Sequence, residues 1–146
     1  MNIKTDIIER VAELGLKMRL FKARHTGNNL SELKDRDVLI LELLGQQSGM
    51  NGVELGSHFK GLSLSSISVD LKKLRNLKLV NREIDKKDER KYKFGLTKKG
   101  TARLLEIREL RKSMFEPLAN ALGEDINELK IISKFIQKAI DGLDKL

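Results

Sequence analysis

No cysteine occurs among the 146 residues, so the chain cannot form disulfides, sense redox state through a thiol or bind metal through cysteine sulfur. Histidine occurs only twice, and neither His25 nor His58 has a nearby pair of acids at a metal-binding spacing. No Ser-His-Asp pattern, phosphate-binding loop or paired-carboxylate signature stands out either. We therefore expect no metal, no other cofactor and no enzymatic activity.

Long apolar runs are also lacking. No stretch approaches the roughly 20 residues that a membrane span needs, and the first ten residues, MNIKTDIIER, lack the apolar core of a signal peptide. We expect a cytoplasmic protein without membrane association. With 40% hydrophobic residues the chain can bury a core, and its length suits about one domain.

Positive charge is abundant and unevenly distributed. The formal net charge is +8. Residues 51–95 contain eleven Lys/Arg and six Asp/Glu, so a segment of less than a third of the chain has a net charge of +5. Such a concentration favours a local surface that binds a polyanion. The alternative is a generally basic surface without a dedicated site.

Hydrophobic periodicity predicts four helices in the first half of the chain. The first has an apolar face that repeats every three or four residues (Ile3, Ile7, Val11, Leu14, Met18, Phe21), and turn-forming residues follow at His25–Ser31. A second helix fits residues 34–47. Asn51 can cap a short helix over residues 53–59, and Ser63 can cap a fourth helix whose core stripe is Ile67, Leu71 and Leu74.

A β-hairpin and two more helices follow. Residues 79–84 and 92–96 alternate as two strands, and Tyr92, Phe94 and Leu96 should anchor the second strand to the core. Thr97 can cap the next helix, which Pro117 should kink or divide. The last helix shows a heptad-like apolar seam (Leu129, Ile132, Ile136, Ala139, Leu143, Leu146), and such a seam needs a partner.

Two short helices joined by a tight turn and followed by a hairpin predict a winged helix-turn-helix, within a mainly α (α+β) fold. In this architecture the second helix lies in the DNA major groove. The candidate base-reading residues on or beside its open face are Ser63, Ser65, Ser66, Ser68 and Val69, and the candidate phosphate-binding residues are Lys72, Lys73 and Arg75. The alternative is that the serines only cap the helix and face solvent.

The segment DKKDERKYKFGLTKKG, residues 85–100, has seven Lys/Arg and three Asp/Glu around the second strand. It resembles the wing of the MarR-type winged-helix transcription regulators, which reads Asp, any, basic, Asp, any, Arg, and then a strand ending in Leu-Thr, any, any, Gly. The positions that match this pattern are Asp85, Lys87, Asp88, Arg90, Leu96, Thr97 and Gly100. The resemblance extends in pattern over nearly the whole chain.

The resemblance implies a role for each matching wing residue. Arg90 would enter the DNA minor groove, where a guanidinium suits the negative potential, and Asp88 would orient it through an ion pair. Lys86 and Lys87 would add basic contacts. The alternative for Asp88 and Arg90 is an exposed salt bridge of little energetic value.

The resemblance also implies an organisation and a function. Residues 1–146 would form one MarR-like domain, with a DNA-binding lobe at 33–96 and dimerisation helices at 1–24 and 101–146. The expected function is a homodimeric transcription regulator, a repressor that binds a pseudo-palindromic operator in double-stranded DNA. Relatives often bind an aromatic or anionic effector, although nothing in this sequence names one.

Two departures from the family pattern affect base recognition. Val69 stands where relatives commonly have a basic residue, and Asp70 stands where they have an apolar one. One extra residue also occurs around HFKGLS. Two alternative functions stay open: a winged-helix scaffold for a protein partner, and an architectural DNA binder with low sequence preference, which Val69 and the serine-rich face would suit.

Overall fold

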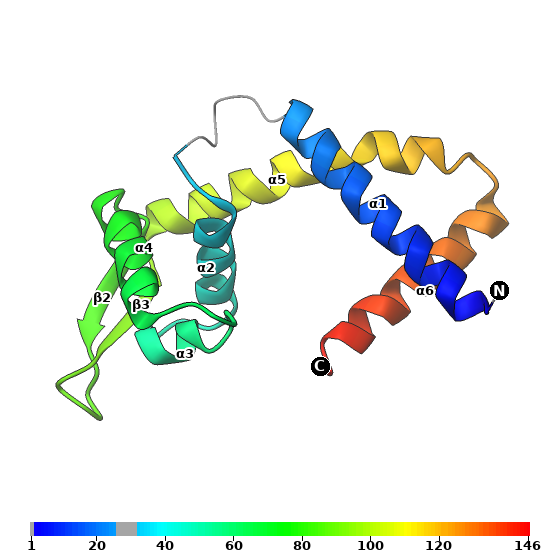
Figure 1. The fold of residues 1–146 in the computed structure, drawn as a ribbon. Coiled ribbons are helices and arrows are strands. Elements are labelled where there is room, and N and C mark those ends of the chain that lie inside the picture. Colours follow the sequence, from blue (N-terminus) through cyan, green and yellow to red (C-terminus); the bar gives the residue numbers. More distant parts are fainter. Residues whose placement is uncertain (1, 26–31) are drawn as a thin grey trace. The chain divides into compact units, whose positions relative to one another are not determined.

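The computed structural model describes residues 2–25 and 32–146. Figure 1 shows its elements, which are α1 (Ile3–His25), α2 (Asp35–Gln46), β1 (Met50–Asn51), α3 (Gly52–Gly56), α4 (Leu64–Asn76), β2 (Val80–Ile84), β3 (Tyr92–Leu96), α5 (Lys98–Ala121) and α6 (Ile126–Leu143). One compact unit extends to Ile107 and a second comprises Arg108–Leu146, so α5 contributes to both. The turn predicted after α1 lies, beyond His25 itself, outside the described residues.

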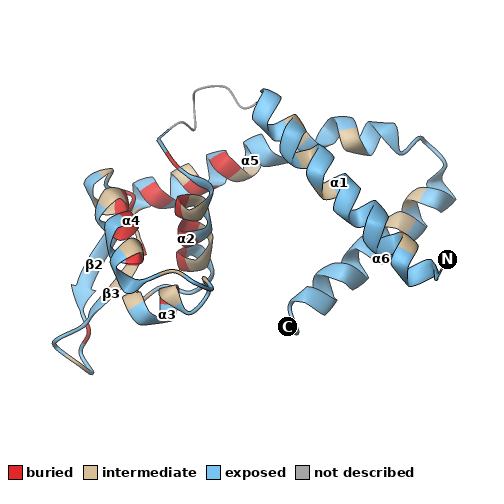
Figure 2. Cartoon of the chain, in the orientation of Figure 1, coloured by how far each residue is buried: buried red, intermediate tan, exposed pale blue. Residues whose placement is uncertain are grey.

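The hydrophobic core lies within the first unit, on the helices and strands of the predicted DNA-binding lobe and on the first half of α5 (Figure 2). Its buried members are Leu33, Ile40, Leu41, Leu44, Met50, Leu55, Ile67, Leu71, Leu74, Leu79, Val80, Leu104 and Ile107. The stripe Ile67, Leu71 and Leu74 is the one that the sequence predicted for the fourth helix, so α4 presents the expected face to the core. The opposite face is left for solvent or a ligand.

Three strands form one antiparallel sheet in the order β1-β3-β2. β2 pairs with β3 through Val80–Leu96, Arg82–Phe94 and Ile84–Tyr92, which confirms the predicted hairpin. The two-residue β1, which pairs Met50 with Phe94, was not predicted, because a strand that short shows no alternation.

The expected anchoring of β3 is correct for two of its three residues. Phe94 and Leu96 pack against the core, but Tyr92 is exposed, and the Arg82 guanidinium lies 4.3 Å from the centroid of its ring. Tyr92 differs because the hairpin extends past the core at that end, so its ring is covered by a cation rather than by apolar side chains. The prediction for Tyr92 was wrong.

The predicted helix caps are present. Asn51 Oδ1 accepts from Glu54 N at 2.8 Å, Ser63 Oγ accepts from Ser66 N at 3.2 Å, and Thr97 Oγ1 accepts from Gly100 N at 2.9 Å. Each cap satisfies one of the unpaired N–H groups of a first helical turn.

The Leu-Thr-any-any-Gly segment, residues 96–100, connects the start of α5 to the backbone just before β2 by hydrogen bonds. The Thr97 hydroxyl donates to Lys78 O at 2.6 Å, and Thr97 N donates to Leu79 O at 3.1 Å. A Cβ atom on Gly100 would lie 2.0 Å from Leu79 O, closer than any real side chain could come. This part of the motif therefore holds the fold together rather than contacting a ligand.

Two expectations about the C-terminal helices need correction. Pro117, which was expected to kink or divide its helix, lies inside α5, which continues to Ala121, so it does not divide the helix and the kink stays a prediction. The proline sits in the last turns of α5, where the loss of one backbone donor disturbs little of the remaining helix. The predicted apolar seam extended to Leu146, but α6 ends at Leu143, so Leu146 lies outside the helix.

Candidate nucleic-acid interface

The candidate recognition helix, α4, has well-defined ends. Ser63 caps its start. At its end, Leu79 N donates to Leu74 O at 3.0 Å and Lys78 N donates to Arg75 O at 2.9 Å, the paired bonds of a Schellman motif. Lys78 adopts φ 61°, the left-handed conformation that this motif requires. These caps fix where the helix begins and ends relative to the sheet.

Four predicted site residues form the exposed face of α4. Ser65, Ser68, Val69 and Lys72 are all exposed, and the Val69 side chain is 68% exposed. They combine two hydroxyls, an apolar group and a cation, which can meet base edges, thymine methyls and phosphates respectively.

Ser63 and Ser66 lie at the start of the helix and are already hydrogen-bonded to each other. Their hydroxyl oxygens are 3.1 Å apart, and Ser63 also caps the backbone. Ser63 is exposed and Ser66 is half-buried. A base contact from Ser66 would therefore have to compete with the cap.

The remaining two predicted cations of α4, Lys73 and Arg75, are both half-buried. Lys73 Nζ donates to Asp37 Oδ2 at 2.7 Å, and the Asp37 side chain is only 1% exposed. A lysine that neutralises a buried carboxylate is held by that partner more strongly than an exposed one. Lys73 thus already has an anionic partner within the fold, whereas Lys72 extends toward solvent.

Asp70, the acid that departs from the family pattern, is buried and paired. Arg36 on α2 donates to it through two nitrogens, Nε to Oδ2 and Nη2 to Oδ1, the second at 3.1 Å. Its hydrogen bond to Asp70 raises the pKa of the Arg36 guanidinium, which stays charged at any physiological pH. The partner of the unusual acid is therefore an arginine from another helix.

The loop between β2 and β3, called the wing loop below (residues 85–91), is ordered by two carboxylates. Asp85 is buried, and its Oδ1 accepts from Lys87 N at 2.9 Å and lies 4.0 Å from Lys93 Nζ. Asp85 N also donates to Lys91 O at 2.9 Å, which closes the loop. Figure 1 shows the hairpin extending past α3 with this loop outermost.

Asp88 braces Arg90 in the way that the resemblance implied. Asp88 Oδ1 accepts from Arg90 N and from Arg90 Nε, both at 3.1 Å, while the Arg90 side chain remains 89% exposed. The side-chain bond from Arg90, followed by the backbone bond, holds the pKa of Asp88 below its usual 3.8. Lys86 and Lys87, beside this pair, are exposed as well.

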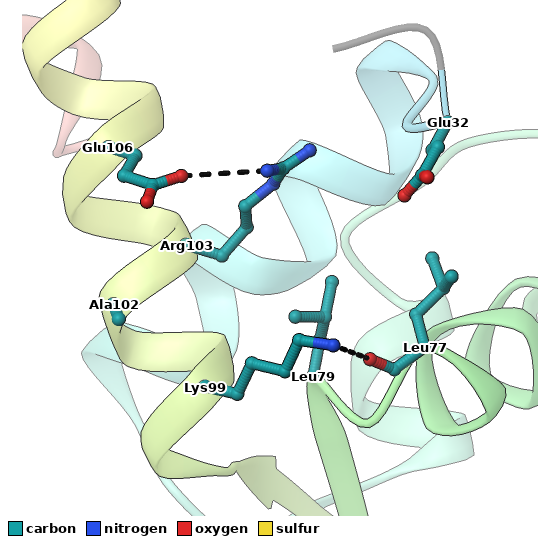
Figure 3. A pocket seen from close by; sticks show the side chains of 7 residues that line it. All are labelled: Glu32, Leu77, Leu79, Lys99, Ala102, Arg103 and Glu106. Atoms are coloured by element: carbon teal, nitrogen blue, oxygen red, sulfur yellow. Dashed lines mark hydrogen bonds and ion pairs between the residues drawn. The ribbon is translucent and has the colours of Figure 1, made fainter. Parts of the chain in front are cut away.

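A separate hollow of about 240 Å³ lies beside the start of α5 (Figure 3). Its lining residues are Glu32, Leu77, Leu79, Lys99, Ala102, Arg103 and Glu106. Its cations already have partners: Lys99 Nζ donates to Leu77 O at 3.2 Å, and Arg103 Nη1 lies 3.5 Å from Glu106 Oε2. This arrangement gives no reason to assign an anionic ligand here.

Sequence reasoning missed three residues near α4. Leu64, at the first position of α4, is 56% exposed and lies next to Ser65 on the exposed side of the helix. Arg36 and Asp37 were missed because their partners lie more than thirty positions away. One signal was available: Asp70 falls between Ile67 and Leu71 on the core side of the helix, where an acid requires a partner.

Within residues 2–25 and 32–146, no helix is sufficiently long and apolar to cross a membrane. Over the same residues, no three or more His, Cys, Asp or Glu side chains gather as a metal site would need.

A capped helix, α4, on a helical core, followed by a sheet with an ordered loop between β2 and β3, defines the winged helix-turn-helix class. No family model matches the chain, and no curated protein matches it in sequence. Solved structures do match its fold. A crystal structure of MarR is 20% identical with a TM-score of 0.71, over 96% of this chain and 98% of that one.

Two similar structures contain DNA. FabT of Streptococcus pneumoniae in complex with DNA is 14% identical, with a TM-score of 0.68 over 99% of both chains. A MepR mutant of S. aureus bound to an oligodeoxyribonucleotide is 19% identical, with a TM-score of 0.60 over 98% of this chain and 99% of that one. The chain therefore has the MarR-type winged-helix fold.

Proposed function

We propose that the chain is a double-stranded DNA-binding transcription regulator that acts as a homodimer and represses genes through a pseudo-palindromic operator. The observation that carries the proposal is the pair of exposed, charged elements on one lobe. α4 presents Ser65, Ser68, Val69 and Lys72, and the wing loop presents Arg90 braced by Asp88. Structures of the same fold in complex with DNA support it.

α4 and the wing loop would contact different grooves of the DNA. α4 would read base edges in the major groove, and Arg90 would enter the minor groove, where a guanidinium meets the strongest negative potential. Lys72, Lys86 and Lys87 would contact phosphates and fix the register. Arg75, half-buried near the end of α4, would contribute a weaker backbone contact.

Dimerisation is supported by apolar side chains that the single chain leaves in water. On α1, Ile3, Ile7 and Val11 are exposed, and on α6 the exposed residues include Phe135, Ile136 and Leu143. Several exposed apolar side chains on one helix usually mark an interface. A two-fold dimer would cover them and would place two recognition helices on two half-sites.

The test is selection of duplexes from random DNA, followed by binding of the selected and random duplexes over a range of salt. If each dimer neutralises about 6 to 10 phosphates, affinity should fall by roughly 10³ to 10⁵ between 50 and 200 mM salt. Selected DNA should bind far more tightly than random DNA. A strong salt effect without such preference would identify the architectural alternative, and a flat response would identify a protein-binding scaffold.

Specific reading by α4 is tested with Ser65→Ala/Val69→Ala, compared with Lys72→Ala. The first variant should change which sequences are selected, because it alters groups that face the bases. The second should weaken all duplexes about equally, because it removes a phosphate contact. An unchanged selected motif in the first variant would exclude direct readout by this face.

A further inference from the structure

Two adjacent charges on α2 pair with two charges one turn apart on α4. Arg36 binds the Asp70 carboxylate through two nitrogens, and Asp37 Oδ2 accepts from Lys73 Nζ at 2.7 Å. The four residues, Arg36, Asp37, Asp70 and Lys73, are called the α2–α4 clamp below. The clamp lies on the flank of the recognition helix, adjacent in sequence to the exposed Val69 and Lys72.

The acids of the clamp are shielded from water. The side chains of Asp37 and Asp70 are 1% and 8% exposed, while those of their cations are about one-third exposed. Asp37 Oδ2 also accepts from Lys34 N at 2.8 Å at the start of α2, whereas its buried Oδ1 has no hydrogen-bond partner among the described residues. Asp37 therefore links the backbone at the N-terminus of α2 to Lys73 on α4.

The apolar contacts of α4 include no hydrogen bond or ion pair that would restrain its rotation. Ile67, Leu71 and Leu74 hold the helix to the core by contacts that have no preferred direction. A rotation of only about 20° would move a side chain about 5 Å from the helix axis by about 2 Å, enough to break a hydrogen bond to a base.

The order of charges in the clamp specifies one register. If α4 slid by one turn, Arg36 would face Lys73 or Asp37 would face Asp70, and both pairings repel. The planar fork of Arg36 on Asp70 adds a directional restraint that a single point charge lacks. The clamp therefore opposes both sliding and rotation.

We propose that the α2–α4 clamp consists of positioning residues, which set the rotation and register of α4 so that its exposed face can discriminate between DNA sequences. The inference rests on the proposed function and deepens it, since it assigns sequence discrimination to residues that do not touch the bases. It also explains why an acid, Asp70, can occupy a position where relatives have an apolar residue: Arg36 on α2 supplies its ion-pair partner.

Stability alone does not explain the clamp. Replacing both members of a buried ion pair by apolar residues of similar volume is often neutral or stabilising, whereas removing one member alone is costly. A variant that exchanges both members can therefore stay folded while losing directional control. This separates positioning from folding.

The experiment uses Arg36→Met/Asp70→Leu, which leaves net charge unchanged. Operator and random duplexes are obtained by selection with the wild type, and affinity for both is measured beside the melting temperature. We expect equal or higher thermal stability and unchanged affinity for random DNA. Discrimination between the two duplexes should fall by about tenfold or more, the size of one lost base contact.

The matched control is Lys22→Met/Asp35→Leu, which removes the exposed ion pair between Lys22 Nζ and Asp35 Oδ1 at 2.8 Å, beside the clamp but without reaching α4. It should keep wild-type discrimination. If the first double variant does not fold, Arg36→Lys decides, because it keeps the charge and removes only the fork. It should lose discrimination while affinity for random DNA stays unchanged.

Wild-type discrimination in the folded double variant, or in Arg36→Lys, would overturn the inference. An equal loss in the control pair would overturn it as well. A wild type that itself fails to prefer selected over random DNA would show instead that the proposed function is wrong, and the inference would fall with it. Failure of the proposed function would thus be seen in the wild type, and failure of the inference would be seen in the variants.

Discussion

At the scale of the residue, Arg90 combines high exposure with a defined position. Its guanidinium is free to meet a ligand on most sides, while Asp88 holds its Nε at 3.1 Å. Exposed pairs of this kind add little to folding. The value of the pair must therefore be sought in binding rather than in stability.

We predict that Arg90→Ala leaves the melting temperature nearly unchanged and weakens operator binding by on the order of 10- to 100-fold per half-site. Arg90→Lys should recover only part of the loss, because an ammonium lacks the planar fork. Asp88→Ala should have a milder effect, because it frees Arg90 without removing its charge. Anisotropy titrations beside thermal melts measure all three, and Lys138→Ala on α6 controls for the loss of any one cation. Wild-type affinity in Arg90→Ala would show that the wing does not touch DNA.

The Asp88 carboxyl provides a second test of the same pair. Its pKa lies below the usual 3.8 in the folded chain, so the associated stabilisation is present above 3.8 and is lost as pH falls through the lowered value. Between about pH 5 and 8 the pair should thus be constant. An NMR titration should show the pKa of Asp88 rising toward 3.8 in Arg90→Ala. The rise should be incomplete, because the backbone N–H at position 90 still donates to the Asp88 carboxylate. No change in this pKa would mean that the side chains do not pair in solution.

Lys72 and Lys73 are neighbours of the same type with opposite surroundings. Lys72 is exposed, whereas Lys73 neutralises the buried Asp37. We predict that Lys72→Met lowers the salt dependence of DNA binding by about one contact per subunit without changing stability. Lys73→Met should cost about 1 to 3 kcal/mol of folding free energy, because the buried Asp37 carboxylate loses its cation and keeps only the bond from Lys34 N, and it should leave the salt dependence unchanged in folded protein. The reverse pattern, measured by thermal melts and salt titrations, would make Lys73 the phosphate contact.

At the scale of the element, the recognition helix ends on a strained residue. Lys78 has φ 61°, and a side chain makes this conformation unfavourable, whereas glycine adopts it readily. The Schellman bonds at Leu79 and Lys78 compensate for this strain. The end of α4 is therefore a place where a single change should stabilise the fold.

We predict that Lys78→Gly raises stability by about 0.5 to 1 kcal/mol, after the greater freedom of glycine in the unfolded chain is offset. Thermal denaturation should show the increase. Lys78→Ala is the control, because it removes the same charge but keeps a Cβ at positive φ, and it should bring no gain. If both variants gained equally, relief of charge repulsion rather than of backbone strain would be the cause.

At the scale of the whole molecule, buried residues are confined to the first unit. None of the residues of α6, all of them described, is buried, and its apolar side chains include Phe135, Ile136 and Ile140, each about half exposed or more. Positive charge is concentrated elsewhere, in residues 51–95. Exposed apolar side chains are thus found on α6, whereas the excess of positive charge lies in residues 51–95.

We predict that Ile136→Glu prevents dimerisation, because an unpaired carboxylate buried in an interface costs several kcal/mol. Sedimentation should show monomer, with the winged-helix lobe still folded because Ile136 is exposed in the single chain. Lys134→Glu is the control: it introduces the same acid about 160° around the helix and should remain dimeric. A wild type that sediments as a monomer at micromolar concentration would exclude the dimer.

Local patterns in the sequence were sufficient for the order of the six described helices and the β2–β3 hairpin, though not for β1. The periodic stripe of α4, the caps at Asn51, Ser63 and Thr97, and the alternation of the hairpin each depend on residues only a few positions apart, and all are present. The wing motif likewise placed Asp88 beside Arg90, since their bonds span two positions. Short-range geometry is nearly the same in any fold, so sequence spacing determines it.

Pairings between distant elements were decided only by tertiary structure. The partners Arg36–Asp70 and Asp37–Lys73 lie 34 and 36 positions apart, and β1 exists only because β3 returns beside Met50. The exposure of Tyr92 likewise depends on how far the hairpin extends past the core. Which charges meet depends on how helices pack in space, and many packings share one local pattern. For that reason the sequence alone determined that α4 carries cations, and the fold decided that Lys73 is held by Asp37 while Lys72 is left exposed.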